Sequence, residues 1–179
     1  MSHHSDPARS TRLPMTVNQF GDLAIRAATL ADLPTIARFN SLLAEETEHK
    51  QLDPATIERG VRRALSEPGL CRYFVAEQDG RIVGQAMITI ELTDWRDGVL
   101  WWLQSVYVAE AHRGAGVFRS LFQHILSLAQ ADADVRGLRL YVERENERAK
   151  RVYEQMGMQP SGHLVYERDW SSLAAGGRR

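Results

Sequence analysis

The stretch that decides the fold is Val106-Tyr107-Val108-Ala109-Glu110-Ala111-His112-Arg113-Gly114-Ala115-Gly116-Val117-Phe118-Arg119. An apolar strand ends here, a glycine-rich turn follows, and an amphipathic helix begins at once. Backbone N–H groups at the positive end of a helix favour phosphate or pyrophosphate, and glycines remove the Cβ atoms that would keep such a ligand away. Arg113 and Arg119 add positive charge. The stretch therefore predicts an anion-binding loop between a strand and a helix.

Three known anion-binding loop patterns compete as interpretations of this stretch. The dinucleotide pattern G-x-G-x-x-G fails because Arg119 stands where the third glycine belongs, and the P-loop pattern fails for want of its Gly-Lys-Ser/Thr ending. The run from Arg113 to Phe118 resembles the acetyl-CoA loop of the GNAT superfamily of acetyltransferases, Arg/Gln-x-x-Gly-x-Gly/Ala. Phe118 departs from the pattern at its last, small position. A plain structural turn is the alternative.

A second motif lies about thirty residues further on. The segment 140–158 is similar to the second GNAT motif, Asn-x-x-Ala-x-x-x-Tyr-x-x-x-Gly-Phe, with Met158 in place of the final Phe. Asn146, Ala149 and Tyr153 follow helical spacing and share one helix face. The resemblance implies that Tyr153 is the catalytic general acid, which donates a proton to the departing CoA thiolate. An aromatic packing residue is the alternative for Tyr153.

The resemblance also implies the donor and the way in which it binds. The cofactor is acetyl-CoA (coenzyme A), and its pantetheine arm lies between two splayed strands, paired with backbone groups of Val106 and Val108. A backbone N–H near Val106 polarises the thioester carbonyl. The expected cofactor-binding residues are Val106, Tyr107, Val108, Arg113, Gly114, Ala115, Gly116, Val117, Phe118, Arg119, Asn146, Ala149 and Tyr153.

The acceptor is expected to be a primary amine of a small molecule, acetylated directly in a ternary complex. The amine must lose a proton before it attacks, and Glu46, Glu48 and Glu91 are candidate bases, with Glu46 assigned as catalytic. Trp101 and Trp102 face opposite sides of a strand, so that one belongs to the core and the other could floor the acceptor pocket. The expected substrate-binding residues are Glu46, Glu48, Trp101 and Trp102. A solvated acidic loop is the alternative for the glutamates, and their charge favours a cationic amine such as an amino acid, a polyamine or an aminoglycoside-like compound.

The fold class is α/β: a GNAT-like mixed central sheet of about six to seven strands, with helices on both faces and a splay between the fourth and fifth strands. Thr29 and Asp32 form a capping box before the first helix, and Asp53-Pro54 starts the second. A polar break at 45–50 separates the two helices. The expected strands are 23–27, 73–77, 82–91, 99–108, 138–142 and 164–167, and the expected helices are 30–45, 54–65, 117–131 and 146–156.

Bulk properties set the remaining expectations. The chain has 179 residues and a net charge of −1, which suits one domain and points to neither nucleic acid nor a membrane as partner. Cys71 is the only cysteine, so no internal disulfide forms, and no residue cluster has metal-ligand spacing. We expect a flexible leader over 1–20, one N-acetyltransferase domain over 21–170, a loose tail over 171–179 and a cytoplasmic location. GNAT domains often pair, so a homodimer is expected.

Two other functions remain open from the sequence. A protein or peptide N-acetyltransferase would need an open groove in place of a closed pocket. A non-catalytic acyl-CoA-binding module would explain Phe118 but would have no use for Tyr153.

Overall fold

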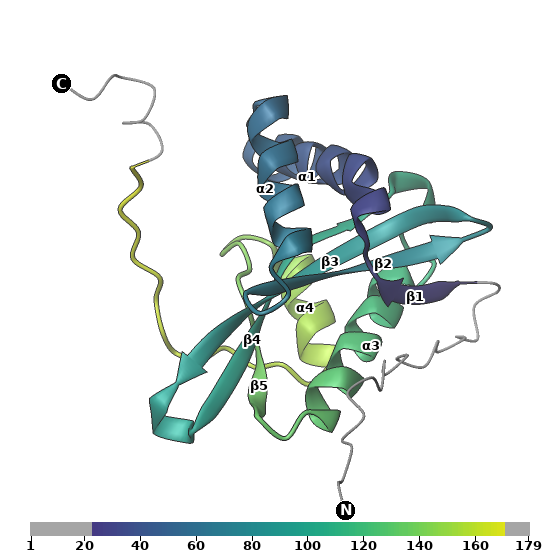
Figure 1. The fold of residues 1–179 in the computed structure, drawn as a ribbon. Helices are drawn as coiled ribbons and strands as arrows, with labels where there is room; N and C mark the ends of the chain where they lie inside the picture. Colours follow the sequence, from purple (N-terminus) through teal and green to yellow (C-terminus); the bar gives the residue numbers. More distant parts are fainter. Residues whose placement is uncertain (1–22, 171–179) are drawn as a thin grey trace, which may run out of the picture. The chain divides into compact units, whose positions relative to one another are not determined.

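A computed structural model describes residues 23–170 of the chain (Figure 1). The chain forms two compact units, one ending at Tyr141 and the other beginning at Val142. The predicted leader over 1–20 and the tail over 171–179 lie outside the described residues, and the single domain over 21–170 stays a prediction.

The first unit is built on a mixed five-stranded sheet whose spatial order is the chain order. The first four strands run antiparallel, and the last pair is parallel. A parallel pair needs a crossover, which is supplied here by a helix, α3 (Val117–Ala131). The strands are β1 (Ala24–Ala27), β2 (Cys71–Gln78), β3 (Arg81–Thr93), β4 (Gly98–Val108) and β5 (Val135–Leu140).

Helices cover both faces of this sheet, as predicted. Tyr73 of β2 packs in a cluster with residues of α1 (Leu33–Glu48) and α2 (Pro54–Ser66). The next residue, Phe74, contacts His124 of α3 with ring centroids 5.6 Å apart. Successive strand residues point to opposite faces, so α1 and α2 share one face and α3 covers the other (Figure 1).

The start of the first helix is tied to two strands by a charged network. The Thr29 backbone N–H donates to Oδ2 of Asp32 at 2.7 Å, as the predicted capping box requires. The Arg26 guanidinium of β1 donates to both Asp32 oxygens at 2.8 and 2.9 Å and to Glu77 of β2 at 2.9 Å. These hydrogen bonds from Arg26 hold the pKa of the Asp32 carboxyl below its usual range. The box precedes a 3-10 turn, so α1 begins at Leu33 and not at residue 30.

The predicted polar break at 45–50 is wrong in its first half. Helix α1 continues to Glu48 and ends where His49 adopts a left-handed φ of 52°. Ala and Glu favour helix whether or not they are buried, so exposed charge alone does not end it. Glu46 and Glu48 therefore lie on the last turn of α1 and not in a loop. The second helix begins as predicted, with the Asp53 carboxylate accepting from the Thr56 N–H at 2.8 Å.

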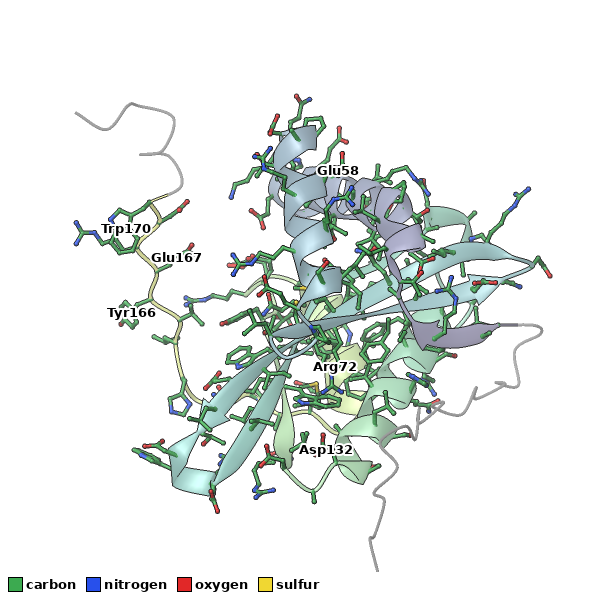
Figure 2. All side chains as sticks on the ribbon, viewed as in Figure 1. Glu58, Arg72, Asp132, Tyr166, Glu167 and Trp170 are labelled. Atoms are coloured by element: carbon green, nitrogen blue, oxygen red, sulfur yellow. The ribbon has the colours of Figure 1, made fainter. Side chains whose placement is uncertain are left out.

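The expectation of six to seven strands is not confirmed by residues 23–170, which hold a five-stranded sheet. Residues 164–167 have a strand-like sequence but no regular secondary structure, because a strand requires a ladder partner as well as propensity. Figure 2 shows Tyr166, Glu167 and Trp170 along this extended stretch of the second unit. The strand expected at 138–142 begins earlier, at Val135, because Val135 is already paired with Val99 of β4.

Candidate active site

The glycine loop has the backbone geometry that an anion site needs. Gly114 and Gly116 have φ values of 81° and 82°, in the left-handed region that favours glycine. Gly116 is the N-cap of α3, so the N–H groups of the first turn lie at the positive end of the helix, next to the glycine loop. A hollow of about 580 Å³ opens beside them, and its lining is Leu23, Gln78, Gly114, Ala115, Gly116, Val117 and Arg119. These features fit a phosphate-bearing ligand.

Phe118, the departure from the motif, lies on the first turn of α3. Its ring lies 6.1 Å from that of Phe122, one helical turn further on, with an interplanar angle of 54°. The side chain is half-buried and is not part of the lining of the hollow. The bulky residue at this position therefore packs along the helix.

Arg113, the first residue of the motif, is held by the last turn of α1. Its Nη2 lies 2.6 Å from Oε2 of Glu46, and its Nε donates to the Val108 carbonyl at 2.9 Å. The Tyr107 hydroxyl donates to the other Glu46 oxygen at 2.9 Å. The guanidinium also lies over the Tyr107 ring, 5.4 Å from its centroid. Burial and the adjacent Glu46 carboxylate raise the pKa of Tyr107, so this hydroxyl keeps its proton.

Strand β4 extends beyond the point where its pairing with the parallel strand β5 ends. Pairing with β5 ends at Leu103, opposite Leu140, whereas β4 continues to Val108. We call this point the fork. Next to it, the register with β3 shifts by one residue, and Ser105 has a φ of 48°, which marks a β-bulge.

The orientation of the β4 backbone beyond the fork follows from one hydrogen bond. The Ala109 N–H donates to the Val83 carbonyl of β3 at 2.9 Å. Because N–H groups alternate along a strand, those of Val106 and Val108 point away from β3, toward the side that β5 has left. The pairs recorded for residues 23–170 give this stretch no partner on that side. An extended ligand can add there as a strand does.

The two adjacent tryptophans separate as predicted. Trp101 is buried on the α3 face, 2% exposed. Trp102 is half-buried on the opposite face, where its indole N–H donates to Oε2 of Glu91. Glu91 also lies 3.3 Å from Arg139 of β5, and the Trp102 ring stacks on Tyr141 at 4.5 Å. Glu91 was predicted from the sequence as a candidate base, whereas Arg139 and Tyr141 were not predicted.

A buried polar chain lies under the bulge and was also missed. The Gln85 amide donates to Oδ1 of Asn40 at 2.7 Å and to the Ser105 carbonyl at 3.3 Å. The Asn40 amide donates to the Tyr73 hydroxyl at 3.0 Å, and burial raises the pKa of that hydroxyl. Oε1 of Gln85 is buried with no protein partner. The sequence signal for this chain is a polar residue among the apolar, core-facing positions of an element, as Asn40 is in α1 and Gln85 is in β3.

The second unit carries the second motif on α4 (Glu147–Gln155). The Asn146 side chain caps this helix by accepting from the Ala149 N–H at 2.9 Å. Gly157 ends it with a φ of 85°, as predicted. Ala149 and Tyr153 are half-buried, and burial raises the pKa of the Tyr153 phenol. Asn146 thus lies just before α4 as its N-cap, and Ala149 and Tyr153 follow within the helix.

Another hollow, of about 550 Å³, shares no residue with the loop or the fork. Its lining includes Arg72, Trp101, Asp132 and Cys71. Figure 2 labels Arg72 and Asp132. The Cys71 thiol donates to the Ala64 carbonyl at 3.5 Å, and burial raises its pKa. A thiol that keeps its proton is a weak nucleophile, so Cys71 is poorly suited to carry an acyl group. Residues 23–170 hold no group of His, Cys, Asp or Glu arranged for a metal ion and no helix long and apolar enough to cross a membrane.

The sequence model of the Acetyltransferase (GNAT) family matches residues 36–158. The chain belongs to this family. The match covers the glycine loop, the fork and α4, and it confirms the family predicted from the two motifs.

Similar proteins agree with the GNAT assignment. Mycothiol acetyltransferase of Nocardia farcinica (strain IFM 10152) is 28% identical over 144 residues, which are 80% of this chain and 44% of that protein. The chain thus spans less than half the length of this curated relative. The structure of a possible acetyltransferase from Clostridium difficile 630 is 41% identical, with a TM-score of 0.78 over 82% of this chain and 97% of the other.

A further solved structure shares the fold. The crystal structure of a predicted acetyltransferase with acetyl-CoA, from Clostridium acetobutylicum, has a TM-score of 0.66 and 18% identity over 82% of this chain and 96% of that one. At this identity the likeness concerns the fold alone.

Proposed function

We propose that this chain transfers the acetyl group of acetyl-CoA directly to a primary amine of a small molecule, with both substrates bound at once. The main support is the end of β4. Within residues 23–170, the last residues of β4 pair with no strand on the β5 side, and they run straight into the glycine loop. A ligand with an amide-bearing arm and a pyrophosphate matches these two features in order.

The residues for the donor fall into three groups. The N–H groups that follow Gly116 would hold the pyrophosphate, with Arg119 beside them. Backbone groups of Val106 and Val108 would pair with the pantetheine arm. The third group is Asn146, the N-cap of α4, with Ala149 and Tyr153 of the same helix. When bound, acetyl-CoA supplies an acetyl group activated as a thioester.

The acceptor must arrive with, or be given, a neutral nitrogen. A lysine-like amine has a pKa of about 10.4, so a base or a water chain has to take up one proton. Glu46 stays the predicted base, although its carboxylate is paired with Arg113. Glu48 lies 2.6 Å from Lys50, and Glu91 stands at the fork. The amine then forms the new bond to the acetyl carbon as the carbon–sulfur bond breaks.

Tyr153 balances the remaining protons. The nitrogen releases a second proton as the amide forms, and the departing sulfur takes one from Tyr153, whose phenol is then reprotonated. The Tyr153 Oη keeps its proton at neutral pH because burial raises the pKa of the phenol above its ordinary value of about 10. It therefore has a proton to give as charge develops on the sulfur.

The homodimer and the cytoplasmic location also stay proposals.

Calorimetric titration with acetyl-CoA tests the donor half of this function. We expect the parent to bind at micromolar Kd and Gly114→Glu to bind at least about tenfold more weakly, because a carboxylate would meet the phosphates. Gly80→Glu is the matched control. Gly80 also has a left-handed φ, of 71°, and neither glycine has an atom within 4 Å of an added Cβ.

The control should bind within about threefold of the parent, since both variants add the same charge and the same backbone strain. No binding to the parent at about 1 mM would overturn the acetyl-CoA assignment. Equal losses of acetyl-CoA affinity in the two variants would show that the glycine loop is not part of the donor site.

A further inference from the structure

Four side chains from three neighbouring strands meet at the fork on the face that carries α1 and α2. They are Glu91 of β3, Trp102 of β4, Arg139 of β5 and Tyr141, the residue that follows β5, and we call them the fork cluster. Trp102 donates to Glu91, Arg139 lies 3.3 Å from the same carboxylate, and Tyr141 stacks on Trp102 at 4.5 Å with an interplanar angle of 29°. The Arg139 guanidinium lies 5.5 Å from the Trp102 ring centroid.

The position of the fork cluster ties it to the reaction. Trp102 pairs with Arg139, and the next pair, Leu103 with Leu140, is the last between β4 and β5. The cluster therefore borders the place where the free edge of β4 begins. An acceptor bound there has its nitrogen beside the arm that would lie along Val106 and Val108. This step depends on the proposed function.

The charges of the cluster are paired but accessible. The Glu91 and Arg139 side chains are 43% and 33% exposed, and a single contact of 3.3 Å joins them. An exposed pair of this kind is weak. A carboxylate has about four acceptor positions and a guanidinium has five N–H donors, so each group can bind a ligand while it keeps its neighbour. The cluster thus places a carboxylate, which can pair with a cation, next to a guanidinium, which can pair with an anion.

An α-amino acid carries the complementary pair on one carbon. Its ammonium matches the Glu91 carboxylate, and its carboxylate matches the Arg139 guanidinium. Its side chain would lie against the stacked rings of Trp102 and Tyr141, which are apolar flat surfaces. An amine without a carboxylate leaves Arg139 unmatched, and a polyamine brings a second cation toward it.

We propose that the acceptor is a free α-amino acid with an apolar or aromatic side chain, bound by the fork cluster with its amine toward Glu91 and its carboxylate on Arg139. Arg139 then determines specificity for the carboxylate. Glu91 positions the amine.

A matched acceptor panel tests this specificity at saturating acetyl-CoA, with thiol release as the readout. The panel is L-phenylalanine, L-phenylalaninamide and phenethylamine, which share the ring and the amine and differ in the carboxylate. We expect kcat/KM for the amino acid to exceed that for the other two by about tenfold or more. In Arg139→Gln the amino acid should lose that advantage while phenethylamine changes less than twofold.

The ratio between acceptors is measured within each variant, so partial loss of folded protein does not affect it. Arg139→Lys should recover part of the preference because it keeps the positive charge. The control is Arg62→Gln, which removes an arginine of α2 paired with Glu58 on the surface and should leave the ratio unchanged.

Two results would overturn the proposal: a parent that acetylates phenethylamine as well as L-phenylalanine, and an Arg139→Gln variant that keeps the preference. If acetyl-CoA binds by calorimetry but only polyamines or other small amines are acetylated, the amino-acid acceptor is wrong and the proposed transferase stands. Acetylation of peptides alone would overturn the small-molecule acceptor as well. If acetyl-CoA does not bind, the proposed function itself fails.

Discussion

At the scale of single residues, Tyr153 separates an enzyme from a binding module. Its phenol is half-buried on α4, and burial raises its pKa. A module that only binds acyl-CoA has no use for a protonated hydroxyl at this place, whereas a transferase needs a proton for the departing sulfur.

We expect Tyr153→Phe to lower kcat by about 10²-fold or more, the usual contribution of a general acid, with acetyl-CoA affinity within about threefold of the parent. Because the folded pKa of Tyr153 lies above its ordinary value, the phenol is protonated throughout pH 6–9. The parent's kcat/KM should therefore rise with pH as the amine loses its proton, with no fall due to Tyr153 in this window. Steady-state rates across the window measure both effects, and unchanged turnover in the variant would favour the binding module.

At the scale of elements, α1 and the glycine loop share one guanidinium. Arg113 lies 2.6 Å from Glu46 on the last turn of α1, and Tyr107 of β4 donates to the same carboxylate. Phosphates bound at the loop would attract Arg113, and the negative charge of Glu46 opposes them. The end of α1 therefore competes with the donor for this arginine.

Glu46→Gln removes this competition. We expect the affinity for CoA to rise by about threefold, a change typical of an exposed ion pair, as measured by calorimetry. If Glu46 is also the base, kcat falls by about 10²-fold in the same variant. Glu48→Gln is the matched control, since Glu48 lies on the same turn but is paired with Lys50. The affinity of this variant for CoA should equal that of the parent. Weaker CoA binding in Glu46→Gln would show that the pair holds the loop in its binding form.

The elements also show what a sequence can and cannot predict. Local patterns located the helices and most strands, because caps, periodicity and turns act over a few residues. They missed that α1 runs on through Glu46, since exposed glutamates suit a helix as well as a loop. The fork cluster was missed because Arg139 and Glu91 are 48 residues apart and meet only through strand register. Register depends on which strands pair, which no short stretch contains.

At the scale of the whole molecule, the Arg26 network ties β1, the start of α1 and β2 together. Asp32 is 7% exposed and accepts from Arg26 and from the Thr29 backbone. These hydrogen bonds lower the pKa of Asp32, with Arg26 the largest cause. A carboxyl with a depressed folded pKa stabilises the fold above its unfolded pKa of about 3.9, and this contribution is lost as pH falls through the folded pKa.

We expect Asp32→Asn to lower the free energy of unfolding at pH 7 by about 1–3 kcal/mol, as the loss of a hydrogen-bonded charge does. The difference from the parent should begin to shrink below pH 4, because Asp32 of the unfolded parent takes up a proton there, and it is lost fully only as pH falls through the lowered pKa of folded Asp32. Urea unfolding at pH 7 and pH 3 measures this difference in the free energy of unfolding, with Glu58→Gln as the control variant. Glu58 forms an exposed pair with Arg62 on α2 (Figure 2), so its loss should cost no more than about 0.5 kcal/mol. A difference that is the same at both pH values would exclude the charge as its source.

The unequal lengths of β4 and β5 have a consequence for how such a protein can change over evolutionary time. On the free edge of β4 the donor would be read by main-chain groups, which every amino acid provides alike, so mutations of the side chains there need not disturb it. The acceptor side depends on side chains such as Arg139 and Tyr141, drawn from several strands. New acceptors can therefore arise by point mutation at the fork while the donor half is inherited unchanged.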